Sequence, residues 1–428
     1  MQRVTFFRKR WNLRSSIFFL IFFFMISQFC VRVFHMPGVI TYVGDMLVIA
    51  FLFLVVMTKK GLSCIRRYAL GISCVIGFFL LQTLVGFLGN LYSPLLYVWG
   101  GRKVFAPYIY LLTCVIALNV SDVRSVIKVL EKLFVICFAL VVIQFAMGYR
   151  DDAIGGIYGM GGKGTNGLLN VFISLISTVT VVQYLNDKAS LKKTAIYLLM
   201  TIIMAAVVEL KALFVELILI VGMALVLSKP SRKTVYIVGI CAAGIALAIP
   251  AMYHLYPSFK NFFTWDFLMS YLSMDKGYAM TGDLNRIGGL SYIYQNILHS
   301  GFQKVFGIGL GNAEFSGYSF FTSDFYRSYQ DALHYAWFAH LMFLLENGIL
   351  GLLCFVLVFV VVFVKAVRLN VRNHVDRDLL IIACICCVLA LFFAVYNNTI
   401  RDYNTTILLY FFIAIPCIVD KTTSERGE

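Results

Sequence analysis

The sequence predicts an all-α polytopic integral membrane protein with about 12 transmembrane helices. Of its 428 residues, 61% are hydrophobic and only 13% are charged, whereas soluble domains are about 45–50% apolar and about 25% charged. The apolar residues gather in blocks about 20 residues long, which is the length that a helix needs to cross the hydrocarbon core of a bilayer. This composition excludes soluble enzymes, secreted disulfide scaffolds and disordered proteins.

Twelve apolar ranges are the expected spans. They are 16–34, 39–57, 68–88, 104–118, 133–148, 167–185, 195–208, 212–228, 234–253, 337–364, 379–396 and 405–419. They divide the chain into three parts. Spans one to nine lie within 1–253, a large outer loop occupies 254–333, and spans ten to twelve with a cytoplasmic tail lie within 334–428.

The first two spans each carry a charged residue, and charges at membrane depth are costly enough to be candidates for function. Arg32 lies near the end of span one, so we expect its side chain to snorkel to the interface. Asp45 lies one and a half turns into span two. There we favour a structural role, in which the acid is paired or hydrogen-bonded to another helix, over a catalytic one.

A glycine-rich outer loop, 155–167, joins spans five and six. Glycines let backbone N–H groups crowd around an anion, which would suit a phosphate. The loop is not a nucleotide P-loop, because Gly164 follows Lys163 where that motif needs Ser or Thr. We favour a flexible turn over a phosphate site.

The run 195–228 would be about 51 Å long as one helix, whereas the hydrocarbon core is about 30 Å thick. It must therefore break, and its polar cluster is Glu209-Leu210-Lys211. We place a tight outer turn there, between spans eight and nine. At this turn Lys211 faces either water or an anionic substrate.

The segment 254–333 is the soluble-looking part of the chain. Its five Lys plus Arg and six acids give a net charge of about −1, and it carries 19 aromatic residues, a residue type that suits the water–lipid interface. A structureless loop of 80 residues would be unusual. We therefore expect short helices lying on the outer membrane face.

At the end of this segment, Arg327, Asp331 and His334 fall at i, i+4 and i+7, so a helix entering span ten would align them in one stripe. In that stripe Asp331 would fix the tautomer of His334, which would accept a proton. From spacing alone we favour the alternative, a solvated Arg–Asp pair beside a boundary histidine. The six histidines show no ligand-like pair, so no metal or cofactor is expected.

Glu346-Asn347-Gly348 interrupts the 28-residue run of span ten. Such an interruption is typical of a helix that leaves lipid and lines a cavity. Structural and functional roles for Glu346 are equally favoured.

Positive charge predicts the orientation. With the N-terminus inside, the inner segments hold 24 Lys plus Arg and the outer ones 12. Five of those 12 lie in 254–333, which is too long for charge bias to count, so the contrast is 24 against 7. Both termini are therefore expected in the cytoplasm. Topology and anionic inner-leaflet lipid account for the net charge of +15, and no nucleic-acid partner is implied.

The order of these features resembles the O-antigen polymerase and O-antigen ligase family of bacterial polytopic inner-membrane glycosyltransferases. The likeness covers about twelve spans, cytoplasmic ends and one large periplasmic loop before the tenth span. Four local segments carry it: TYVGDMLVIAFLF around Asp45, AAVVELKALFVELIL around Lys211, NRIGGLSYIYQNILHSGFQKVFGIGLGN with Arg286 and Gly307, Gly309 and Gly311, and HYAWFAHLMFLLENGILGL around Glu346.

Two departures from the family pattern matter. Lys211 stands where that family usually carries Arg, which keeps the charge but loses the bidentate fork. The position usually held by His-Asn is Trp337-Phe338 here, and His334 lies one helical turn earlier. These departures weaken the match of His334 to the family pattern more than they weaken the match of Lys211.

The resemblance implies metal-independent transfer of a polyprenyl-diphosphate-linked glycan on the outer membrane face. Lys211 and Arg286 are expected to neutralise the leaving diphosphate, and His334, oriented by Asp331, to activate the acceptor hydroxyl. Further phosphate contacts are expected from Arg327, Lys163 and Arg401.

The function expected from these features is polymerisation of surface polysaccharide repeat units, either O-antigen or capsule, in the bacterial inner membrane. The alternative within the class is a ligase that transfers glycan onto lipid A core. A secondary transporter or lipid flippase is the alternative from another class, and a non-catalytic scaffold is the third. Expected partners are the polyprenyl-diphosphate-linked oligosaccharide, membrane lipid, and flippase and chain-length regulator proteins.

Overall fold

A computed structural model describes residues 13–162, 164–229, 231–257, 264–266, 284–373 and 375–427. Within these ranges the protein is all-α, with 16 α-helices and no β-strand. Seven helices are long and apolar enough to cross a membrane: α1, α4, α7, α10, α15, α16 and α17. These candidate spans indicate a multi-pass membrane protein.

Each of the twelve apolar ranges of the sequence falls on a helix. These helices are α1 (Leu13–Val33), α2 (Tyr42–Met57), α4 (Leu70–Asn90), α5 (Pro94–Ala117), α6 (Val120–Ala146), α7 (Thr165–Leu185), α8 (Leu191–Val207), α9 (Lys211–Leu227), α10 (Arg232–Leu255), α15 (Ala339–Arg372), α16 (Arg377–Tyr396) and α17 (Tyr403–Arg426). A further helix, α3 (Lys59–Tyr68), follows α2 and is strongly amphipathic.

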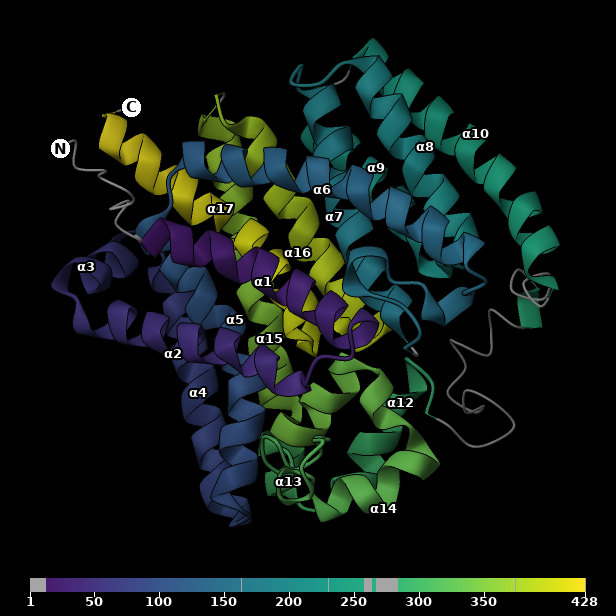
Figure 1. Ribbon diagram of the computed structural model, residues 1–428. Coiled ribbons are helices and arrows are strands. Elements are labelled where there is room, and N and C mark those ends of the chain that lie inside the picture. The colour runs from purple at the N-terminus through teal and green to yellow at the C-terminus, as the bar shows by residue number, and fades with distance from the viewer. Residues whose placement is uncertain are drawn as a thin grey trace, which may run out of the picture.

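The helices α7, α16 and α17 form the centre of the molecule. Their side chains are almost all buried, as expected for helices that are apolar on all sides. Helices α8, α9 and α10 lie on one side of α7, and α4, α5 and α15 lie toward the other side of the molecule, whereas α1, α2 and α6 run across one flank (Figure 1).

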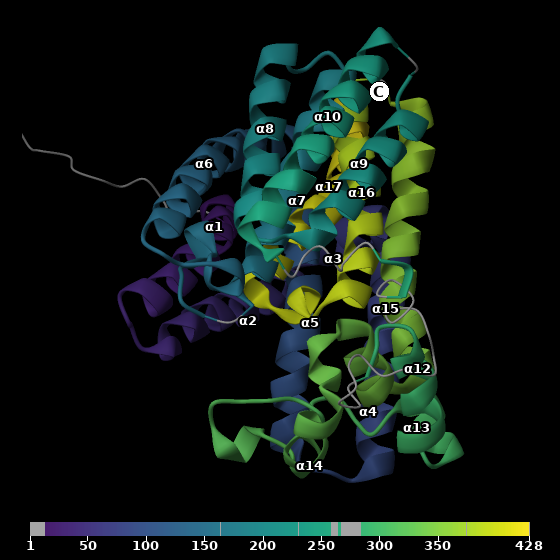
Figure 2. The same ribbon diagram turned by 90° about the vertical axis from the view of Figure 1, so that its right-hand side faces the viewer.

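The segments that the sequence assigns to the inner side are joined by ion pairs. Arg124 contacts Asp376 at 2.8 Å and Asp378 at 2.9 Å, which ties the start of α6 to the start of α16. Similar pairs are Arg14–Asp122, Lys193–Glu131, Lys233–Asp187, Lys365–Asp420 and Arg426–Asp376. The C-terminal end lies opposite the outer-segment helices in both views (Figures 1 and 2).

The described part of the outer segment forms short helices, as predicted. They are α12 (Gly288–Tyr292), a π-helical turn (Ile293–Ile297), α13 (Gly301–Phe306) and α14 (Asp324–Leu333). Leu284, Ile293 and Leu298 pack with Leu341 and Leu345 of α15 in a second, smaller hydrophobic core. This core fixes the outer segment to the first turns of α15.

Two predicted helix breaks are confirmed. α8 ends at Val207 and α9 begins at Lys211, so the turn lies at the polar cluster, where Glu209 adopts a positive φ of 56°. Within α15, Gly348 has φ 65° and interrupts the helix. A Cβ at Gly348 would overlap the Val305 backbone, so a glycine is needed for the close approach of α13.

Candidate functional site

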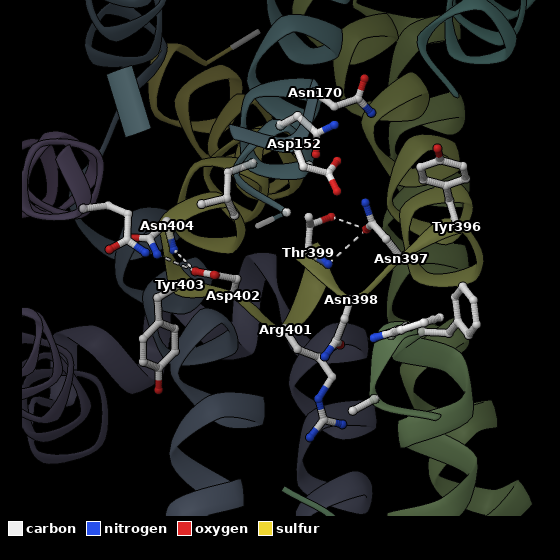
Figure 3. Close-up of a pocket in the computed structure, with 18 of the residues that line it drawn as sticks. Asp152, Asn170, Tyr396, Asn397, Asn398, Thr399, Arg401, Asp402, Tyr403 and Asn404 are labelled. Atoms are coloured by element: carbon white, nitrogen blue, oxygen red, sulfur yellow. Dashed lines mark hydrogen bonds between the residues drawn. The ribbon is translucent and has the colours of Figure 1, made fainter. Parts of the chain in front are cut away.

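A cavity of about 1250 Å³ lies between the helical bundle and the outer segment. Every segment that the sequence assigns to the outer side contributes to its lining. One residue from each of the six is Gly38, Arg102, Asp152, Lys211, Arg286 and Asp402. Figure 3 shows several lining side chains, including Asp152, Asn170 and Arg401, arranged around this space.

Charged side chains are the main feature of the lining. Six are cationic: Arg32, Arg102, Lys103, Lys211, Arg286 and Arg401. Five are acidic: Asp151, Asp152, Glu209, Glu314 and Asp402. Because the two sets nearly balance, the cavity favours an anion through cations at particular places and not through a large positive field.

The structure brings together three of the cations predicted from the sequence. Lys211, Arg286 and Arg401 all line this cavity, although 75 residues separate the first two and 115 the last two. Lys163 lies outside the described residues, next to Gly164 of the lining.

Arg286 is held by aromatic rings and backbone carbonyls. Its guanidinium lies 5.0 Å from the ring centre of Phe338 and 4.8 Å from that of Tyr396, and its Nε donates to the Tyr396 carbonyl at 3.1 Å. Its own carbonyl lies 2.6 Å from Nε2 of His340, whose Nδ1 is 2.9 Å from the Ala394 carbonyl. The buried His340 therefore links the Arg286 backbone to α16.

Lys211 begins α9 directly after the outer turn. Its Nζ lies 3.0 Å from the Glu209 carboxylate, and its side chain is 29% exposed. Glu209 therefore holds the lysine at the cavity wall, and the lysine side chain remains accessible from the cavity.

Arg401 lies in a buried charge network. Its Nη2 donates to Glu314 and, at 2.7 Å, to Glu346, and Glu314 also accepts from Lys103. The Arg401 side chain is only 3% exposed. Its Nε and Nη1 are also buried and find no hydrogen-bond partner among the described residues.

Glu314 is the acid that this network keeps ionised. Burial opposes its charge, but Lys103 and Arg401 outweigh that effect and lower the pKa of the carboxyl well below its usual range. Two strong cationic partners make Glu314 a weak proton acceptor.

Glu346 has a structural role in this arrangement. Its Oε1 accepts from the backbone N–H groups of Gly311 and Ala313 at 3.0 and 3.2 Å, and its carbonyl accepts from Gly309 N–H. The side chain is fully buried, and a Cβ at Gly311 would overlap the Leu96 carbonyl of α5. The Gly-x-Gly-x-Gly stretch is thus packed closely between α5 and the break in α15.

The predicted stripe of Arg327, Asp331 and His334 is wrong. α14 ends at Leu333, and His334 follows in the left-handed conformation with φ 50°, so no helix continues into α15. Arg327 is 53% exposed and contacts Asp324 at 3.3 Å, and His334 stacks on Trp337. Arg327, Asp331 and His334 are not among the residues that line the cavity.

Three other expectations have clear outcomes. Asp45 pairs with Arg102 of α5 at 2.6 Å, which confirms its interhelical structural role. Arg32 does not simply reach to the interface, because it donates to Thr165 and lines the cavity. The first part of the glycine loop is packed, because Ile154 to Gly159 are buried and the Gln144 amide accepts from Gly156 N–H at 2.9 Å, whereas Gly161 and Gly164 are exposed.

Amide and aromatic side chains missed by the sequence reasoning complete the lining. The amides belong to Gln28, Asn166, Asn170, Asn397, Asn398 and Asn404. The side-chain oxygens of Asn170, Asn398 and Asn404 find no partner among the described residues. Amides donate and accept hydrogen bonds, as sugar hydroxyls do, and Trp337, Phe338 and Tyr396 add flat apolar surface.

The arrangement thus combines placed cations, hydrogen-bonding amides and aromatic rings. It suits a ligand with an anionic part and a polar, ring-shaped part. No protein-family model matches this chain, and neither does any curated protein sequence.

Proposed function

We propose that this protein is a glycosyltransferase of the bacterial inner membrane that polymerises repeat units of a surface polysaccharide. In this proposal the twelve apolar helices cross the membrane, both termini lie in the cytoplasm, and the cavity opens to the outer face. The donor is a polyprenyl-diphosphate-linked glycan, and the acceptor is a hydroxyl of the next repeat unit.

The observation that carries the proposal is the convergence of Lys211, Arg286 and Arg401 on one cavity. A diphosphate leaving group gains negative charge as its bond to the sugar breaks, and cations placed beside it stabilise that charge. Phe338 and Tyr396 flank the Arg286 guanidinium and fix it at the cavity wall.

The sugar-binding part of the cavity is formed by the 396–404 segment and α7. Asn397 and Thr399 lie on one wall, and Asn170 projects from α7 on another (Figure 3). One wall of the cavity thus carries hydrogen-bonding groups, and another carries aromatic rings. This combination is typical of sites for polar ring-shaped ligands. The polyprenyl chain of the donor remains in the lipid, against the apolar outer surface of the helices.

The test is the surface-polysaccharide pattern of a deletion strain complemented with wild type, Arg286→Ala or Arg327→Ala at matched expression. We expect Arg286→Ala to reduce the ladder to core plus one repeat, because the diphosphate loses a cation that is fixed at the cavity wall. Arg327→Ala is the matched control, since that arginine lies on exposed α14, and it should keep the full ladder.

Other outcomes separate the alternatives. Polymer that accumulates on polyprenyl lipid without reaching core would indicate a ligase. An unchanged ladder in the deletion strain would contradict any role in this glycan and leave transport of another substrate as the hypothesis.

A further inference from the structure

The five acids that line the cavity differ in what holds them. Glu314 is bound by Lys103 and Arg401, and Glu209 contacts Lys211 at 3.0 Å. Asp402 caps α17, with its Oδ1 accepting from Asn404 N–H at 2.9 Å. These three carboxylates are therefore already engaged in ion pairs or in a helix cap.

Asp151 and Asp152 lie just before the glycine-rich loop, in a tight 3-10 turn (Asp151–Ala153). Asp151 faces Tyr256 next to Glu209, where burial and then the two carboxylates raise the pKa of the Tyr256 phenol to about 12. The Tyr256 hydroxyl also donates to the Val207 carbonyl at 2.5 Å. The loop is therefore fixed beside the turn that carries Lys211.

Asp152 differs from the other four acids. Its side chain is exposed, and no hydrogen bond or ion pair within the described part of the chain engages its carboxylate. Figure 3 shows the carboxylate pointing into the cavity, toward Asn397 and Thr399.

The loop behind Asp152 is rigid enough to hold it there. Ile154 and Met160 form an antiparallel bridge, Gly161 N–H donates to the Ala153 carbonyl at 2.8 Å, and Gln144 binds the backbone of Gly155 and Gly156. A fixed acid in a reaction cavity is the arrangement that general-base catalysis needs.

We propose that Asp152 is the catalytic base that activates the acceptor hydroxyl, an inference that rests on the proposed function. Asp152 takes the hydroxyl proton as the acceptor oxygen forms a bond to the anomeric carbon of the donor sugar. The bond between that carbon and the diphosphate oxygen breaks, and its electron pair leaves with the polyprenyl diphosphate beside Lys211 and Arg286. The proton passes from Asp152 to water afterwards.

The experiment compares purified wild type with Asp152→Asn, Arg286→Ala and Asp324→Asn. Asparagine keeps the size of aspartate but cannot take the proton, and Asp324 is a fully solvated acid on α14. Two quantities are measured: binding of undecaprenyl diphosphate, which is common to donors of any sugar sequence, and the rate of polymer formation from lipid-linked repeat units extracted from the deletion strain.

We expect Asp152→Asn to bind undecaprenyl diphosphate as the wild type does and to form polymer about 10²–10⁴-fold more slowly. Arg286→Ala should lose binding, and Asp324→Asn should change neither quantity. An unchanged rate in Asp152→Asn, or a loss of binding equal to that of Arg286→Ala, would overturn the assignment of Asp152. A wild type that neither binds the diphosphate nor forms polymer would overturn the proposed function and this inference with it.

Discussion

Arg401 is the centre of the buried charge network, and its replacement by methionine tests that network directly. The change removes one cation from between two carboxylates whose side chains are 5% and 0% exposed, Glu314 and Glu346. Glu314 still has Lys103, whereas Glu346 is left with the N–H groups of Gly311 and Ala313. Removing one partner of a buried ion pair costs about 3–5 kcal/mol, so we expect Arg401→Met to lower the free energy of unfolding by about that amount.

A double variant gives the decisive comparison. In Arg401→Met with Glu346→Gln, the glutamine oxygen still accepts the two backbone N–H bonds, and no unpaired buried charge remains. We expect the double variant to lie within about 1–2 kcal/mol of the wild type, because only ordinary hydrogen bonds are lost. Stability is measured by SDS-induced unfolding in mixed micelles without substrate, followed by the fluorescence of the four tryptophans.

The matched control is Arg327→Met, which breaks an exposed pair with Asp324 and should cost at most about 1 kcal/mol. If Arg401→Met is as stable as this control, or if the double variant is no more stable than the single one, Arg401 does not stabilise the fold by compensating the buried carboxylates.

Three further predictions follow from single residues. Lys211→Met should lower the rate of polymer formation by about 10²-fold and Lys211→Arg should restore it, and equal rates for the two would show that the charge is not used. His340→Ala should weaken undecaprenyl diphosphate binding about tenfold, because the Arg286 backbone loses the contact that His340 makes between it and Ala394 of α16; unchanged affinity would show that this contact does not position Arg286. Gly311→Ala should lower the thermal unfolding temperature, since Gly311 has φ 84° and a Cβ would overlap the Leu96 carbonyl, whereas Gly317→Ala, which meets open space, should not.

The helix positions could be predicted because apolar runs and polar interruptions leave few alternatives. Polar residues inside an apolar run must turn out of lipid or find a cavity, and both the 208–210 turn and the break at Gly348 lie where such residues occur. The pairing of Asp45 with Arg102 follows from the same cost of an isolated buried charge.

The composition of the site was only partly predictable. The sequence identifies Lys211 and Arg286 as candidate site residues by their charge and their order along the chain. That they line the same cavity depends on how α9 and the outer segment pack. His334 was misplaced because i, i+4, i+7 spacing assumes an unbroken helix, and a single left-handed residue ends α14. Asp152 has no signal in the sequence, because a hydrophilic loop has no periodic pattern that shows where a side chain points.

Glu216 provides the last test, between enzyme and transporter. Its carboxyl is fully buried between α9 and α7, where it accepts from Asn170 at 2.6 Å and from the Ser174 hydroxyl. Intramembrane acids with such partners carry protons in pumps and transporters, and Asn170 also lines the cavity.

Glu216→Gln separates the two functions because glutamine can stay hydrogen-bonded to both partners and cannot titrate. The glutamine oxygen accepts from Asn170, and its NH2 group donates to the Ser174 hydroxyl in place of the bond that the carboxylate accepts. In a glycosyltransferase the reaction takes place in the cavity, so the variant should keep the full polysaccharide ladder, whereas Glu216→Leu should lose part of it by releasing Asn170. A proton-coupled transporter would instead lose function in Glu216→Gln and Glu216→Leu alike. Loss of the ladder in Glu216→Gln, with undecaprenyl diphosphate binding intact, would therefore count against the enzyme and in favour of transport.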